Sequence, residues 1–268
     1  SGLDGYFSPS LPIPSYELQS QGFDVNDGGL FMEDPRQPGH YHLKIGARDT
    51  QSYHWLDAYR KGTFDRLYND FFYRRNNEFW KEKAMQKLPA LLDSTGMLAC
   101  GEDLGMIPAT VPQVMDDLRI LSLEIQRMPK SVEETFAHPA NYPYLSVCTT
   151  STHDMNPIRA WWEEDREVTN DFWHMILGNQ GEAPYFCEPW ICRQILDQHV
   201  WSPAMLTILP LQDWLSMDEQ LRREDPNTER INVPANSRHY WRYRMHLTLE
   251  QLEAADEFNK TLSDMIAA

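Results

Sequence analysis

Four short apolar runs, each ending in polar residues, constrain the fold of this chain more than any other feature. They occupy residues 97–100, 121–125, 144–148 and 205–211. Uninterrupted apolar runs of this length are typical of strands that are buried on both faces, as parallel strands are. Helical patterns follow at 108–118, 158–166, 187–199 and 247–266. Strand, polar tip and helix therefore repeat about four times, which predicts an α/β sheet or barrel.

Four such units are half of an eight-stranded (β/α)8 TIM barrel, whose catalytic groups sit at the carboxyl ends of the strands. A doubly wound sheet is the alternative. It is disfavoured because no strand tip carries a glycine-rich phosphate loop.

The first part of the chain has a different pattern. Residues 1–60 contain prolines and an Asn26-Asp27-Gly28-Gly29 cluster, which favour loops or short strands. Residues 64–92 repeat apolar side chains at helical spacing and predict one long amphipathic helix that Pro89 ends or kinks. The predicted organisation is an irregular arm or insertion at 1–63, followed by the half-barrel at 64–268.

Charge and composition exclude several functions. The chain has 24 Lys and Arg against 40 Asp and Glu, a net charge of −16, which disfavours nucleic acid and anionic membranes as partners. No apolar run is long enough to cross a membrane, and no signal sequence opens the chain. The four cysteines lack C-x-x-C spacing and are expected to be free thiols. We therefore expect a cytoplasmic protein.

The polar tip after residue 100 contains two acids, Glu102 and Asp103, with glycines on both sides. A carboxyl group beside a buried strand is expected to be partly desolvated, which favours its protonated form, as a general acid requires. The alternative is that one of the two acids caps the next helix.

A second tip, at 149–154, ends in His153 and Asp154. Such a pair can bind sugar hydroxyls, and the carboxylate can stabilise the positive charge that develops as a glycosidic bond breaks. A helix cap and a metal site are the alternatives, although zinc would need ligands that do not accompany this pair. Trp161 and Trp162 follow and fit helix packing better than a sugar platform. A third group comprises Gln212, Asp213, the stretch 230–236 and the pair Trp241-Arg242. It suits hydroxyl contacts but is weak evidence by itself.

These residues carry a resemblance to a known family. The matching strings are Gly-Glu-Asp-Leu-Gly at 101–105, Thr-His-Asp at 152–154, Leu-Gln-Asp at 211–213 and Asn-Val-Pro at 232–234. Their order and spacing resemble the amylomaltases, the 4-α-glucanotransferases of glycoside hydrolase family 77. The strings at 99–105, 125–129 and 159–165 look most like the plant cytosolic disproportionating enzymes and their bacterial relatives. The resemblance extends from about residue 64 to residue 250.

The resemblance implies roles for individual residues. Glu102 matches the general acid/base, Asp154 the carboxylate that stabilises the transition state, and His153 a sugar ligand. We also expect substrate contacts from a further set of residues: Asp103, Gln212, Asp213, Asn232 and Pro234. The nucleophile of the family is an Asp in an Arg-Ile-Asp-His motif, which this sequence lacks. We therefore expect the C-terminal part of the barrel, with the nucleophile, and any starch-binding modules, outside this chain.

The resulting prediction is a 4-α-glucanotransferase that moves glucosyl or maltooligosaccharide units from maltose or α-glucan donors to sugar acceptors, without a cofactor or metal. The fragment alone is expected to be inactive and to self-associate through its open sheet edges. The alternatives are a carbohydrate-binding or inactive half-barrel, a metal-dependent hydrolase built on His153 and Asp154, and an α-glucan hydrolase of the α-amylase type.

Overall fold

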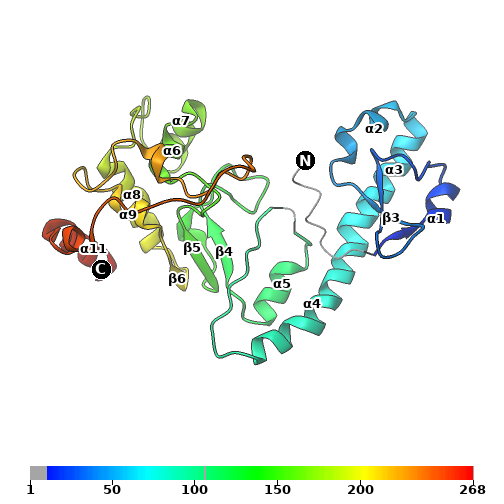
Figure 1. The fold of residues 1–268 in the computed structure, drawn as a ribbon, viewed down its shortest axis with the longest axis horizontal. Helices are drawn as coiled ribbons and strands as arrows, with labels where there is room; N and C mark the ends of the chain where they lie inside the picture. Colours follow the sequence, from blue (N-terminus) through cyan, green and yellow to red (C-terminus); the bar gives the residue numbers. More distant parts are fainter. Residues whose placement is uncertain (1–10, 106, 268) are drawn as a thin grey trace. The chain divides into compact units, whose positions relative to one another are not determined.

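The computed structural model describes residues 11–105 and 107–267 (Figure 1). The chain forms two compact units: Ser1–Ala99 with Met106–Arg119, and Cys100–Gly105 with Ile120–Ala268. The predicted boundary at residues 63 and 64 falls inside helix α3 (Ala58–Asp70).

The first unit combines a small antiparallel sheet with helices. Its strands pair in the order β1-β3-β2 and are β1 (Ile13–Pro14), β2 (Phe31–Glu33) and β3 (His40–Leu43). Its other elements are α1 (Ser15–Ser20), η1 (Ala47–Asp49), α2 (Gln51–Trp55), α3, η2 (Phe71–Arg75), α4 (Asn76–Asp93) and α5 (Val111–Asp117). Short strands were predicted in the first 60 residues. They contribute to a core, in which Phe23 and Phe31 pack edge-on against Phe64 with ring centroids 5.9 and 6.0 Å apart.

The long helix predicted at 64–92 is helical throughout but is not uniform. Asp57 caps α3 by accepting the Arg60 amide at 2.9 Å, and the π-helical turn η2 joins α3 to α4. Pro89 lies inside α4, which continues to Asp93. The helix therefore continues for its last turn beyond Pro89, although proline has no amide hydrogen to donate to the preceding turn.

The second unit is built on a parallel sheet with the order β4-β5-β6 (Figure 1). Its strands are β4 (Ser122–Ile125), β5 (Ser146–Thr149) and β6 (Leu206–Thr207), and Cys100 adds a parallel bridge to Leu121. Each of the four predicted apolar runs therefore contributes residues that pair in parallel with a neighbouring run, and the order of the runs in the sheet follows their order in the sequence. The first run differs from the prediction, because only Cys100 pairs and Met97 and Leu98 are exposed rather than buried.

Helices alternate with these strands. They are η3 (Pro139–Asn141), α6 (Ile158–Trp162), α7 (Arg166–Met175), α8 (Pro189–Val200), α9 (Leu211–Leu215), η4 (Pro226–Glu229), α10 (Leu249–Glu253) and α11 (Asp256–Ala267). Helix α7 was not predicted, and the single helix expected at 247–266 is two. The fourth apolar run was expected to be strand as far as Leu211, but Leu211 begins α9 directly after Pro210.

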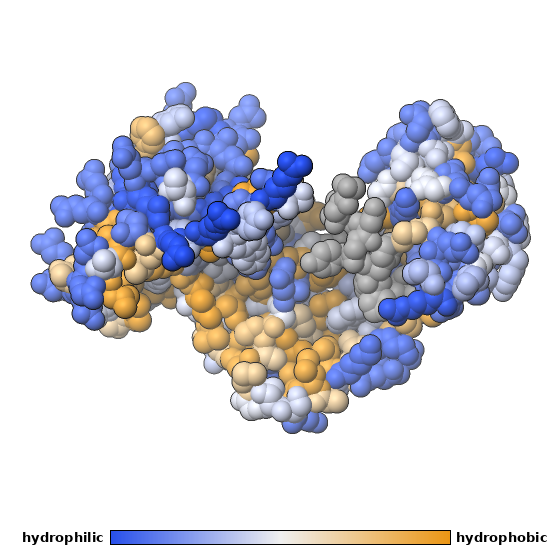
Figure 2. Space-filling model, viewed as in Figure 1, coloured by the Kyte–Doolittle hydropathy of each residue, from blue (hydrophilic) through white to orange (hydrophobic). Residues whose placement is uncertain are grey.

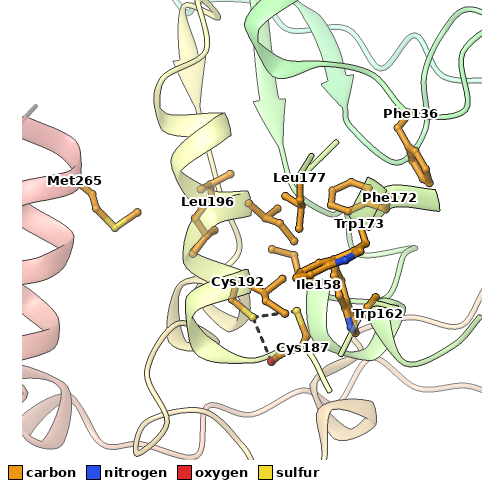
Figure 3. Packing of buried hydrophobic residues seen from close by; sticks show 14 residues of the cluster. Phe136, Ile158, Trp162, Phe172, Trp173, Leu177, Cys187, Cys192, Leu196 and Met265 are labelled. Carbon is orange, nitrogen blue, oxygen red and sulfur yellow. Dashed lines mark hydrogen bonds between the residues drawn. The ribbon is translucent and has the colours of Figure 1, made fainter. Parts of the chain in front are cut away.

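The core of the second unit is aromatic (Figure 3). Trp162 is fully buried against Phe172 and Trp173, and its indole nitrogen donates to the Pro184 carbonyl at 2.9 Å. The four cysteines are free thiols, as expected.

Hydrophobic surface remains over this sheet (Figure 2). Ile208, just after β6, is 61% exposed, and Tyr144, just before β5, is 66% exposed. Within the described residues, no helix combines the length and the apolar character that a membrane span would require.

Candidate active site

The tip of β5 presents His153 and Asp154 on an exposed surface. The Asn232 side-chain amide donates to Asp154 Oδ1 at 2.5 Å, and the Asn232 backbone amide donates to the His153 carbonyl at 3.0 Å. His153 Nε2 lies 3.4 Å from Asp154 Oδ2. The imidazole also lies against the Trp241 ring, with centroids 4.8 Å apart. Asp154 Oδ1 is therefore oriented by a hydrogen bond and Oδ2 lies near the His153 ring, while the carboxylate itself stays accessible.

Asp213 supports this tip from inside the protein. It is fully buried, and its Oδ2 accepts the Thr150 and Ser151 hydroxyls at 2.5 and 2.7 Å. Its Oδ1 accepts the Ile158 amide at 2.8 Å. Three donors thus fix the orientation of this buried carboxyl group. Asp213 thus joins the start of the β5 tip to the first residue of α6.

Arg127, just after β4, holds the same loop at two points. Its guanidinium donates to the Thr150 carbonyl at 2.7 Å and to the Asn156 carbonyl at 2.9 Å. It also lies 4.8 Å from the centroid of the Trp161 ring. Burial lowers the pKa of Arg127 to about 10, so the group is still a cation at neutral pH. The residues from Thr150 to Asn156 are therefore clamped at both ends.

The segment that carries Glu102 is anchored on either side of it. The Gly101 amide donates to the Leu121 carbonyl at 2.8 Å. Asp103, which is buried, accepts the Leu123 amide at 2.9 Å and the Lys130 ammonium at 2.7 Å. Glu102 itself is exposed, so the partial desolvation expected for it is absent from the described structure.

The structure bears on the alternatives for these tips. Asp103 accepts a strand amide, and α5 begins at Val111 without a side-chain cap, so neither acid at 102–103 caps that helix. No group of three or more metal-ligating side chains occurs among residues 11–105 and 107–267. Trp162 is fully buried, and Trp161 packs on the same core. The tryptophan pair thus packs a helix, as predicted.

The predicted site residues therefore fall into two groups. His153, Asp154 and Asn232 meet at the β5 tip, and Pro234 is exposed two residues further along the Asn232 loop. Asp103, Gln212 and Asp213 are buried, and their side chains form hydrogen bonds with other residues of the protein. Gln212 Nε2 donates to the Glu229 carbonyl at 3.3 Å.

Glu102 follows the pairing strand next to β4, and Asp154 follows β5. Because the pairing is parallel, both acids follow the carboxyl ends of their segments, Glu102 two residues after Cys100 and Asp154 five residues after the end of β5.

Two supporting residues were not predicted: Arg127 and Lys130. Arg127 lies in a string that was noted only for its resemblance, and Lys130 follows it by three positions. Trp241 is 59% exposed beside His153, from which it is 88 positions distant in sequence. The sequence placed Trp241 in the third group of candidate residues, but its contact with His153 is visible only in the structure.

Comparisons with known proteins give one consistent result. The family described as 4-alpha-glucanotransferase, glycoside hydrolase family 77, matches residues 48–249. The chain is 37% identical to 4-alpha-glucanotransferase DPE2 of Oryza sativa subsp. japonica over 92% of its own length and 26% of that protein. It is 28% identical to the 4-alpha-glucanotransferase of Chlamydia muridarum over 97% of its length and 51% of that protein. An amylomaltase structure from Streptococcus agalactiae in complex with acarbose matches 88% of this chain and 49% of that one, at 16% identity and a TM-score of 0.49.

Proposed function

This chain belongs to the 4-alpha-glucanotransferase family, glycoside hydrolase family 77, and we propose that it supplies the general acid/base, Glu102, and the transition-state carboxylate, Asp154, of such an enzyme. The chain spans about a quarter of the rice relative and half of the chlamydial relative. The proposed reaction is therefore that of the whole protein: transfer of α-1,4-linked glucosyl or maltooligosaccharide units from maltose or glucan donors to sugar acceptors.

The reaction proceeds in two displacements with retention of configuration. In the first, Glu102 donates its proton to the leaving glycosidic oxygen while a nucleophilic carboxylate bonds to the anomeric carbon. In the second, Glu102, now a base, removes the proton from an acceptor hydroxyl, which displaces the carboxylate. The sequence has no Arg-Ile-Asp-His motif, so this scheme assigns the nucleophile to no residue of this chain.

The observation that best supports this proposal is the way Asp154 is held. The Asn232 amide donates to one of its oxygens, the His153 imidazole lies 3.4 Å from the other, and the loop beneath it is clamped by Asp213 and Arg127. A carboxylate oriented in advance stabilises an oxocarbenium-like transition state without having to reorganise during the reaction. Asp154 remains exposed enough to meet a sugar ring.

The buried acids and amide have supporting roles in this proposal. Asp103 fixes the Glu102 segment to β4, and Asp213 and Gln212 join the β5 tip to α6 and to η4. Glucan contact is assigned to His153, Asn232 and Pro234. In this proposal, Glu102 is desolvated by the bound glucan and by the rest of the barrel. The four parallel-paired segments described above make up only half of such a barrel.

A maltose disproportionation assay tests the proposal. The full-length protein should convert maltose into glucose and longer maltooligosaccharides, whereas the 268-residue chain should not. Production of glucose alone would indicate an α-glucan hydrolase instead. Binding of maltoheptaose without any turnover by the full-length protein would support the carbohydrate-binding alternative.

A further inference from the structure

A group of polar side chains, two of them buried and two half-buried, lies next to the Asn232 loop and has no role in the proposed reaction. Glu229, the last residue of η4, is 1% exposed. Neither of its carboxylate oxygens has a hydrogen bond of ordinary geometry with any residue described in the structure, and the same holds for Arg159 Nε, Arg223 Nε and the Tyr243 hydroxyl. Helix α6, which carries Arg159, packs on η4. The Arg223 guanidinium lies 5.6 Å from the centroid of the Tyr243 ring.

Backbone carbonyls hold the two guanidinium groups: Arg159 donates to the Arg223 carbonyl at 2.6 Å, and Arg223 donates to the Arg244 carbonyl. The carboxyl group of Glu229 is within electrostatic range of Arg159, Arg223 and Asp213. Ionisation of Glu229 therefore places a charge inside the protein beside Arg159 and Arg223, where electrostatic interactions are stronger than in water. The conformation of the surrounding segments should respond to that single charge.

Glu229 is connected to the β5 tip in two ways, one along the chain and one through hydrogen bonds between segments. Along the chain, Glu229 is three residues before Asn232, and Arg230 Nε donates to the Asn232 carbonyl at 2.8 Å. Through space, the Glu229 carbonyl accepts from Gln212. The residue after Gln212 is Asp213, which binds Thr150 and Ser151. Glu229 is thus connected to both sides of the contact between Asn232 and Asp154.

We infer that Glu229 is a positioning residue: its charge sets the placement of the Arg230–Asn232 segment and, through the Asn232 amide, the orientation of Asp154. This inference uses the proposed role of Asp154 for its effect on catalysis, but the structural coupling between Glu229 and Asn232 stands without it.

The charge of Glu229 changes near neutral pH. Burial raises the pKa of its carboxyl to about 7, Arg159 lowers it, and Asp213 raises it. The groups that face it are Arg159 from α6, Asp213 from α9, and Arg223 and Tyr243 from the adjoining segments. Because the pKa is higher in the folded than in the unfolded chain, Glu229 favours folding most at low pH. That contribution decreases as the pH rises from about 4.5 to 7.

The coupling can be measured without any activity. In the 268-residue chain with 15N-labelled asparagine, the side-chain amide signal of Asn232, assigned by its loss in Asn232→Ala, should shift with an apparent pKa near 7. The shift should vanish in Glu229→Gln, which keeps the size of the side chain. It should persist in the matched control Glu224→Gln, an exposed acid in the neighbouring segment, and in His153→Gln, which removes the titratable ring beside Asn232. An Asn232 signal that does not titrate in the wild-type chain, or that titrates unchanged in Glu229→Gln, would overturn the inference.

Kinetics of the full-length enzyme give a second test. Glu229→Gln should lower kcat about 10-fold with little change in KM, because a displaced Asp154 mainly weakens transition-state binding. Adding Glu229→Gln to Asn232→Ala should cost less than about 2-fold more, since the effect of Glu229 acts through the Asn232 amide that is already absent. Fully additive effects would contradict a path through Asn232. If the wild-type enzyme transfers no glucan, the proposed function fails, and the asparagine titration alone decides the coupling.

Discussion

The β5 tip and the segment after Cys100 both present an exposed carboxylate at the same edge of the sheet, but they are held differently. Asp154 has protein partners on both oxygens, and the residues before and after it are clamped by Arg127 and Asp213. In the segment around Glu102, the hydrogen bonds are made by the neighbouring residues Gly101 and Asp103. This difference suits two chemical tasks. A transition-state stabiliser gains from orientation in advance, whereas an acid that later acts as a base needs a carboxyl group free to exchange a proton.

Removing the proton of Glu102 should have the largest effect. In the full-length enzyme, Glu102→Gln should lower transfer from maltose by about 10²–10⁴-fold, the usual contribution of a general acid. Folding should not change, because the side chain is exposed. Initial rates and thermal unfolding measure the two effects, with the exposed Glu133→Gln as the control. Turnover close to the wild-type rate would make Glu102 an ordinary surface acid.

Asp154→Asn should have the next largest effect, about 10²–10³-fold on kcat and much less on KM. The amide keeps the size of the side chain but cannot offer negative charge to the developing cation. Asn232→Ala, which leaves the Asp154 charge but removes its orienting amide, should have a smaller effect in the same direction. Steady-state kinetics on maltotriose separate the effects of each variant on kcat from its effects on KM. A change confined to KM would reduce Asp154 to a ligand of the ground state.

The support of the β5 tip can be tested on the 268-residue chain alone. Asp213→Ala leaves two hydroxyls and one amide unpaired inside the protein, at about 1–3 kcal/mol each when unrelieved. We expect the free energy of unfolding in urea to fall by about 3 kcal/mol. The exposed Asp171→Ala should change it by less than about 0.5 kcal/mol. Equal stability of the two variants would show that Asp213 does not support the tip.

The anchoring of the Glu102 segment should be weaker. Lys130 lies 2.7 Å from both Asp103 and Glu124, but a third of its side chain is exposed. Lys130→Met should therefore cost only about 1 kcal/mol of unfolding free energy, and less at high salt. A loss as large as that of Asp213→Ala would remove the distinction between the two regions.

The sequence predicted the parts of the fold that depend on local pattern. The four apolar runs contribute parallel pairing, and the polar residues after the first and third runs lie at their tips. Leu211 was wrongly placed in a strand because a short apolar run does not distinguish a strand from the start of a buried helix, and Pro210 gave the only local signal. Met97 and Leu98 were predicted to be buried but are exposed. An apolar residue in a strand is buried only where a neighbouring segment covers it, and a local sequence pattern does not identify that neighbour.

The candidate site was predictable by residue type but not by environment. His153, Asp154 and Asn232 were predicted as site residues and do meet. Asp213 and Gln212 have the polar atoms that a sugar site needs, yet those atoms bind the protein's own donors and acceptors. Whether a polar side chain faces a ligand or the interior depends on packing between distant segments, so their sugar contacts stay predictions.

The assignment of Glu102 as acid/base is tested most directly by supplying substrates that need neither acid nor base. Fluoride leaves a maltosyl donor without protonation, and azide attacks a glycosyl intermediate without deprotonation. In the full-length enzyme, Glu102→Gln with α-maltosyl fluoride and azide should recover much of the lost turnover and give the α-maltosyl azide, the retained product. Asp154→Asn should not be rescued, since its defect lies in stabilising the cation. Failure of azide to rescue Glu102→Gln, or equal rescue of both variants, would contradict the division of roles between these two carboxylates.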